Sequence, residues 1–190
     1  MGITDPVSVE DYVAHEGYAG LRKALAMAET EVVQQVLDSG LRGRGGAAFP
    51  TGIKWKTVLD AQADQKYIVC NADEGDSGTF SDRMIMEDDP LTLIEGMTIA
   101  GIAVGADQGY VYIRSEYPHA IATMRKAVDI AEAAGYVGDD ILKSGKRFKL
   151  HIREGAGAYV CGEETALLES LEGKRGVVRA KPPLPAIHGL

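Results

Sequence analysis

A glycine-rich segment at residues 41–55 contains the residue types that bind phosphate. Arg44 lies among its glycines and Lys54 follows them. The exposed N–H groups of such a loop, together with two cations, suit the oxygens of a phosphate. The segment is neither a P-loop, since no Gly-Lys-Ser/Thr closes it, nor a dinucleotide fingerprint, since it follows a predicted helix. A tight connector between helix and sheet is an equally good interpretation of the spacing. The glycines that would approach the anion are Gly43, Gly45 and Gly46.

Polar and mostly acidic turns follow three predicted strands. They cover residues 71–79, 115–117 and 155–164, and two of them are rich in glycine. In an open parallel sheet, ligands bind beyond the carboxyl ends of the strands. A single polar loop is ordinary solvated surface. The same character at three strand ends favours a binding site at that edge of the sheet.

Signals for metal binding and for a nucleophile are weak. The four histidines are scattered without ligand spacing, and neither Cys70 nor Cys161 has a CxxC partner. The sequence therefore predicts no metal site. Cys161 precedes a helix and has no histidine close by in the sequence, so we expect a buried structural thiol.

Three strand–helix units position these turns. Alternation along the chain predicts an α/β fold, a Rossmann-like parallel sheet with flanking helices and right-handed crossovers. A helical and glycine-rich N-terminal segment precedes it. The predicted strands cover residues 67–71, 109–115 and 148–152, and the predicted helices begin at Pro90, Pro118 and near Gly162.

The first forty residues read as helices. Ser8 and Asp11 form a capping-box pattern that opens a helix at Val9, and Thr30 is predicted to cap a later helix that Gly40 ends. The expected division is therefore a helical segment at 1–40 and a Rossmann-like domain at 41–190.

Composition narrows the class of protein. The 190 residues favour one domain, and 28 acidic against 20 basic residues give a net charge of −8. This charge argues against nucleic-acid binding and against a basic membrane surface. No window approaches the apolar length of a membrane span. With two thiols and no visible signal peptide, the expected location is cytoplasmic.

Three long motifs, at residues 43–55, 70–83 and 155–167, occur in order. They resemble the NADH-binding flavoprotein subunit of respiratory complex I and its relatives in NAD-reducing hydrogenases and NAD-dependent formate dehydrogenases. The sequence of residues 73–83 is similar to that of the beta subunit of molybdenum- or tungsten-containing formate dehydrogenases. The resemblance implies a diaphorase-type module in which FMN exchanges a hydride with NAD(H). The cofactors carry this chemistry, so no catalytic side chain is expected.

The resemblance also implies roles for individual residues. Those expected at the flavin phosphate and ribityl chain are Gly43, Arg44, Gly45, Gly46 and Lys54. Those expected to hydrogen-bond the flavin and its hydroxyls are Asn71, Asp73 and Glu74. The opposite wall would consist of Tyr159, Gly162, Glu163 and Glu164, with Glu164 near the NAD. Phe49 would stack on adenine, Asp76 would disfavour NADP, and Lys181 would lie at the pocket mouth.

Some residues depart from the complex I pattern. Thr57 and Leu184 replace aromatic residues, Ala48 replaces a glycine, and Asp76 replaces a glutamate. These changes leave FMN binding largely untouched and weaken the expected adenine stacking.

Family members continue with a ubiquitin-like domain and a helical domain that holds a [4Fe-4S] cluster, so we expect a fragment. The expected partners are the other subunits of a formate dehydrogenase or related NAD-linked complex, including an iron–sulfur thioredoxin-like subunit. Nucleic acid and direct membrane insertion are not expected. A folded assembly module that holds no flavin is the alternative from another class.

Overall fold

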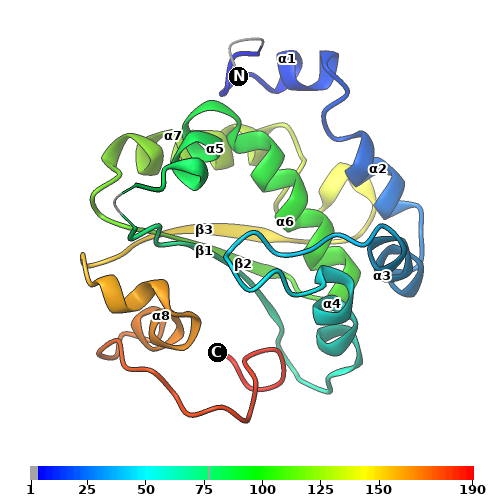
Figure 1. Cartoon of the computed structure of the whole chain (residues 1–190). Helices are drawn as coiled ribbons and strands as arrows, with labels where there is room; N and C mark the ends of the chain where they lie inside the picture. Colours follow the sequence, from blue (N-terminus) through cyan, green and yellow to red (C-terminus); the bar gives the residue numbers. More distant parts are fainter. Residues whose placement is uncertain (1–3, 77) are drawn as a thin grey trace.

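Figure 1 shows a sheet surrounded by helices. Its three parallel strands have the order β1-β2-β3. The computed structural model describes residues 4–76 and 78–190. The strands are β1 at Tyr67–Ala72, β2 at Gln108–Ile113 and β3 at Lys149–Glu154. The predicted α/β parallel sheet is confirmed, with strand limits that differ from the predicted ones by one or two residues.

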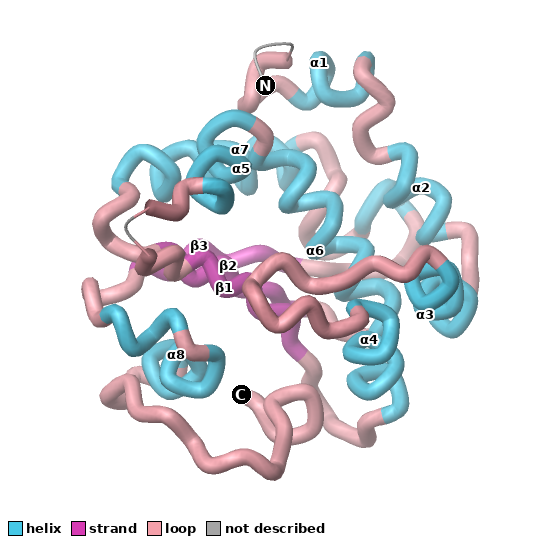
Figure 2. The backbone as a smooth tube through the Cα atoms, in the orientation of Figure 1, coloured by secondary structure: helices cyan, strands magenta, loops and turns pink. Residues whose placement is uncertain are grey.

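Helices cover the two faces of this sheet unequally. Figure 2 shows α5, α6 and α7 on one face and α8 on the other. Sequential strand order explains the first group, because two right-handed crossovers in the same direction place their helices on the same side. These helices are α5 (Ser81–Asp88), α6 (Pro90–Val104), α7 (Pro118–Ala133) and α8 (Glu164–Leu171). The chain therefore changes face after β3.

The core lies between the sheet and helices α6 and α7. Val111 and Ile113 of β2 are fully buried there, with Ile94 of α6 and Met124 of α7. Helix α6 is apolar around most of its circumference, as expected of a helix packed on several sides. Pro90 occupies its first turn, and Gly105 ends it with a φ of 75°.

Four helices form the N-terminal part of the chain. Ser8 caps the first as predicted, since its hydroxyl accepts a hydrogen bond from the Asp11 N–H at 3.1 Å. The prediction that Thr30 caps a helix is wrong, because the Glu31 carboxylate accepts from the Ala28 N–H at 2.9 Å and the helix starts at Glu29, two residues earlier than a Thr30 cap would allow. The helices are α1 (Val9–Ala14), α2 (Ala19–Leu25), α3 (Glu29–Asp38) and α4 (Thr51–Asp60).

Part of the predicted loop at 41–55 is helical. Helix α4 begins at Thr51, directly after Pro50. Gly52 packs against α3, where a Cβ atom would lie 2.6 Å from the Leu37 nitrogen. This glycine therefore serves close helix packing and not an anion. The sequence pattern also does not predict helix α5 or the short 3-10 turn at Tyr159–Gly162.

One carboxylate fixes the N-terminal helices on α6. Glu95 accepts hydrogen bonds from the Tyr12 hydroxyl at 2.6 Å, the Tyr18 N–H at 2.8 Å and the Leu21 N–H at 2.9 Å. Tyr18 is fully buried, and its ring stacks on Tyr136 with centroids 3.7 Å apart. Glu95 thereby sets the position of α1 and α2 from the middle of a largely apolar helix.

We expect Glu95→Gln to lower the free energy of unfolding by about 2 kcal/mol, because the amide loses one acceptor and leaves a part-buried donor unpaired. Urea denaturation measures this change. Glu16→Gln, at an exposed position, is the matched control and should change the midpoint little. Equal midpoints for the two variants would contradict the anchoring role of Glu95.

Candidate functional site

The end of β1 meets the turn that precedes α8. The Asn71 side chain donates a hydrogen bond to the Gly162 carbonyl at 2.9 Å, and its oxygen accepts from the Asp73 N–H at 3.2 Å. One amide side chain thus joins two of the predicted polar turns, which lie 91 residues apart in the sequence.

Three glycines allow close packing of other residues at this edge. A Cβ atom on Gly162 would lie 3.3 Å from the Asp73 carbonyl oxygen, and one on Gly75 would lie 2.7 Å from the ring of Tyr159. A Cβ atom on Gly155, after β3, would likewise lie too close to the ring of Tyr112. Tyr159 lies against Gly75, yet 74% of its surface is exposed. The exposed side of this ring can stack on a flat ligand.

Asp73 is the least satisfied polar group at this edge. Its residue is only 9% exposed, and its Oδ2 is buried without a hydrogen-bond partner in the described chain. Burial raises the pKa of this carboxyl, and Arg114 offsets part of that effect. A hydroxyl or N–H group of a ligand would satisfy the oxygen.

Glu74 supports the site from behind. Its carboxylate accepts from the Asp82 N–H at 2.7 Å, at the start of α5, and from the Tyr117 hydroxyl at 3.0 Å. Arg114 donates to the Glu74 carbonyl. Arg114 and Tyr117 come from the turn after β2, so the structure brings that turn to the first one. The sequence alone assigns neither of them a role, although it identifies their turn as polar.

Two acidic residues and a lysine lie at the start of α8. Glu163 caps the helix by accepting from the Thr165 N–H at 2.8 Å and the Ala166 N–H at 3.0 Å. Lys181 contacts Glu163 at 2.9 Å and Glu164 at 2.6 Å. Burial by itself would raise the pKa of Glu163, but the hydrogen bonds from Thr165, Lys181 and the helix amides outweigh it and lower the pKa to about 2.

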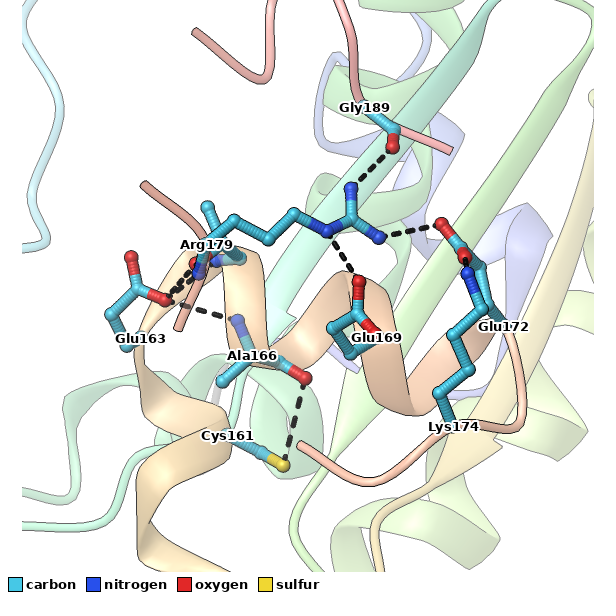
Figure 3. Close-up of polar contacts among 9 residues, drawn as sticks. Cys161, Glu163, Ala166, Glu169, Glu172, Lys174, Arg179 and Gly189 are labelled. Carbon is cyan, nitrogen blue, oxygen red and sulfur yellow. Dashed lines mark hydrogen bonds and ion pairs between the residues drawn. The ribbon is translucent and has the colours of Figure 1, made fainter. Parts of the chain in front are cut away.

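Arg179 clamps the C-terminal segment onto α8 (Figure 3). Its guanidinium donates to Glu172 at 2.6 Å, to the Gly189 carbonyl at 2.7 Å and to Glu169. Its backbone N–H donates to the Thr165 hydroxyl at 2.9 Å. This clamp holds the segment that carries Lys181 beside Glu163.

The glycine loop is exposed and has donors to spare. Within the described residues, the N–H groups of residues 44–48 donate no hydrogen bond, and the Arg44 and Lys54 side chains form neither ion pairs nor hydrogen bonds. The loop closes on itself through the Gly43 N–H and the Phe49 carbonyl at 2.9 Å. No hydrogen bond of the described chain joins it to the acidic turns, so its place at the site stays a prediction.

The thiols carry no sign of reactivity. Cys161 is buried, as predicted, with its Sγ 3.9 Å from the Ala166 carbonyl oxygen. Burial raises the pKa of the Cys70 thiol to about 12. The described residues contain no group of three or more metal-ligating side chains. None of the described helices combines the length and apolarity needed to cross a bilayer.

Comparison with known proteins gives consistent matches. Residues 36–189 match the family model described as the Nuo51 FMN-binding domain. The chain is 56% identical over 188 residues to the NADP-reducing hydrogenase subunit HndC of Solidesulfovibrio fructosivorans, covering 99% of this chain and 38% of that protein. It is 54% identical to an F subunit of the NADH-quinone oxidoreductase of Rhizobium meliloti (strain 1021), covering 100% of this chain and 45% of that protein.

A solved structure shares the fold. The NAD+-reducing [NiFe]-hydrogenase in its H2-reduced state aligns with a TM-score of 0.75 and 44% identity, over 85% of this chain and 27% of that chain. The chain therefore spans less than half the length of these relatives. Neither the two sequence relatives nor this solved structure has the name of a formate dehydrogenase.

The capping role of Glu163 predicts a pH dependence. Because its folded pKa lies below the ordinary 4.5, the carboxylate stabilises the fold above pH 4.5, and this contribution is lost as the pH falls toward 2. Urea midpoints of wild type and Glu163→Gln should therefore differ at pH 6 and converge near pH 2. Glu164→Gln removes a Lys181 partner but no helix cap, so it should lower the urea midpoint at pH 6 by less. A difference that does not vary with pH would contradict this role.

We expect Asp73→Asn to stabilise the flavin-free protein at pH 7 by about 1 kcal/mol, because it removes a buried, unpaired charge. The raised pKa sets the sign: the gain is full above the folded pKa and disappears as the pH falls below the ordinary value of 3.8. Thermal unfolding at pH 7 and pH 3.5 measures it. Asp64→Asn, at an exposed position, is the control, and the same gain there would contradict the burial argument.

Proposed function

This chain belongs to the Nuo51 FMN-binding domain family, and we propose that it binds FMN and exchanges a hydride between this flavin and NAD(H). The observation that carries the proposal is the unpaired Oδ2 of Asp73 beside the exposed Gly162. A ribityl hydroxyl would supply the donor that this oxygen lacks. The unengaged amides of residues 44–48 and the Arg44 side chain suit the flavin phosphate.

The chain contributes mainly by positioning. Hydride transfer requires two flat rings stacked at about 3–3.5 Å, so side chains must stay out of the space between them. Gly162 is exposed and carries no side chain, and Tyr159 offers an exposed ring. Gly75 and Gly155 allow Tyr159 and Tyr112 to pack closely against the backbone. When bound, FMN supplies the two-electron chemistry that no side chain of the site provides. Asn71 holds the two walls together.

Acidic residues would select the nucleotide. Asp76 is exposed near the end of the first turn, and Glu163 and Glu164 lie at the start of α8. Carboxylates accept hydrogen bonds from ribose hydroxyls and repel the extra phosphate of NADP. Lys181, which pairs with both glutamates and leaves a net negative charge, would meet the nucleotide at the pocket mouth. Phe49 would stack on adenine. The name of one relative describes an NADP-reducing enzyme, so the nucleotide preference of this chain is a direct test of the roles proposed for its acidic residues.

The complex in which this chain works is also a proposal. The relatives are subunits of hydrogenases and NADH-quinone oxidoreductases. A formate dehydrogenase is the more specific alternative for this complex, and it is supported only by the sequence of residues 73–83. An iron–sulfur thioredoxin-like subunit would then be among its partners. The electron donor of the native complex decides between them: formate-dependent NAD+ reduction supports the alternative, and hydrogen-dependent reduction excludes it.

Flavin binding is tested by titrating the purified protein with FMN. Bound flavin absorbs at about 370 and 450 nm whatever the protein, so dialysed samples should stay yellow. We expect Asp73→Asn to weaken FMN binding about tenfold and Asp64→Asn to leave it unchanged. A protein that is colourless after dialysis would support the assembly-module alternative.

Nucleotide preference is tested by stopped flow on the FMN-loaded protein. We expect NADH to reduce the flavin much faster than NADPH, since the acidic groups oppose a 2′-phosphate. Asp76→Asn should lower the ratio of the NADH to the NADPH reduction rate about fivefold, because it removes a negative charge whose repulsion of the 2′-phosphate is worth about 1 kcal/mol. Equal rates with the two nucleotides in the wild-type protein would refute this selectivity.

A further inference from the structure

Strand β3 lies at one edge of the sheet in the described chain. The Lys149 N–H donates to the Asp107 carbonyl at 3.0 Å, and the Gly155 N–H donates to the Ile113 carbonyl at 2.7 Å. These bonds show that the N–H and C=O groups of the odd-numbered residues of β3 face β2. In a parallel ladder the alternate residues point the other way, so the N–H and C=O groups of Leu150 and Ile152 face away from the sheet.

A second strand begins to form at this edge and then stops. Gly138 and Phe148 form an antiparallel bridge with hydrogen bonds of 2.7 and 2.9 Å. The next outward-facing residue, Leu150, has no such partner among the described residues, because the segment before Gly138 returns to the end of α7. The edge is therefore suited to strand pairing, and the open part extends from Leu150 to Glu154.

A groove runs along this open part. It has a volume of about 220 Å³ and lies between α7, which contributes Arg125, Val128 and Asp129, and residues 150–153 of β3. Val128 and Leu150 are almost completely buried and form an apolar floor. The groove thus combines outward-facing backbone groups with apolar contacts, which are the two requirements for an added strand.

Two arginines and one aspartate line the groove of a chain whose overall charge is −8. The Arg125 contact with Glu154 is 3.5 Å long, with side chains 55% and 48% exposed, so it is weak. The Arg153 guanidinium lies over the Tyr110 ring at 5.8 Å and has no acidic partner among the described residues. Asp129 is the one acidic residue of the lining.

We propose that an extended, acidic segment of a partner polypeptide adds to the free edge of β3 and places its carboxylates on Arg125 and Arg153. Backbone hydrogen bonds to Leu150 and Ile152 supply the pairing, and the arginines supply the preference for acidic sequence. A second copy of this chain is a poor occupant, because it would bring the same arginines together. This inference does not rest on flavin binding.

The free edge is tested first, by amide hydrogen exchange of the isolated protein. Leu150 and Ile152 should exchange about tenfold faster or more than His151 and Arg153, whose N–H groups bond to β2. Equal protection of all four amides would show that the edge is covered, and would overturn the proposal.

The acidic partner is tested with an eight-residue peptide of alternating valine and glutamate, labelled for fluorescence anisotropy. Binding should slow exchange at Leu150 and Ile152 and weaken about tenfold in the Arg125→Glu, Arg153→Glu double variant, whose changes are at exposed positions. A peptide with lysine in place of glutamate, and one N-methylated at alternate valines, should not bind.

Three results would overturn the proposal. They are no binding of the acidic peptide at about 1 mM, equal binding of the lysine peptide, and unchanged exchange at Leu150 and Ile152 under saturation. Sedimentation equilibrium of the free protein provides a further check. A dimer whose formation protects these same amides would assign the edge to a second copy.

Discussion

The handedness of the crossovers between parallel strands determines much of this structure. With strands in sequential order, both crossovers must place their helices on one face, and α6 and α7 lie there. The other face is then left for the chain that follows β3. Helix α8 occupies it, and its first turn meets the end of β1. The juxtaposition of Asn71 with Gly162 is a consequence of this path.

Much of the fold was predictable from local pattern. The β-rich runs at 67–71 and 109–115, and the prolines at 90 and 118, define strands and helix starts that the structure confirms. Thr30 was wrongly predicted as the cap because two neighbouring residues could cap this helix. In the structure it is the Glu31 carboxylate that accepts the hydrogen bond from the Ala28 N–H. Helix α4 was missed because its glycine suggested a loop. Only the contact with Leu37, which is not visible in local sequence, shows why Gly52 lies in a helix.

The candidate site shows the same division. Polar turns at strand ends were enough to locate Asn71 and Asp73, and the structure brings both to Gly162. Glu74 caps a helix that begins only a few residues later, but the supporting contacts from Arg114 and Tyr117 come from 40 and 43 positions away in the sequence. Likewise, the family resemblance implies a pocket-mouth role for Lys181, which stays a prediction, and its pairing with Glu163 depends on the contacts that Arg179 makes with helix α8.

The buried, unpaired oxygen of Asp73 would couple binding of the proposed ligand to the stability of the fold. A polypeptide that keeps such a group in its empty form is less stable than the same polypeptide with the group satisfied. Any molecule that binds only the folded form raises the ratio of folded to unfolded chains, and this ratio grows with its concentration. Chains made in excess of that molecule would spend more time unfolded and be removed by proteases. Cellular abundance of the protein would therefore follow ligand supply without a dedicated regulator.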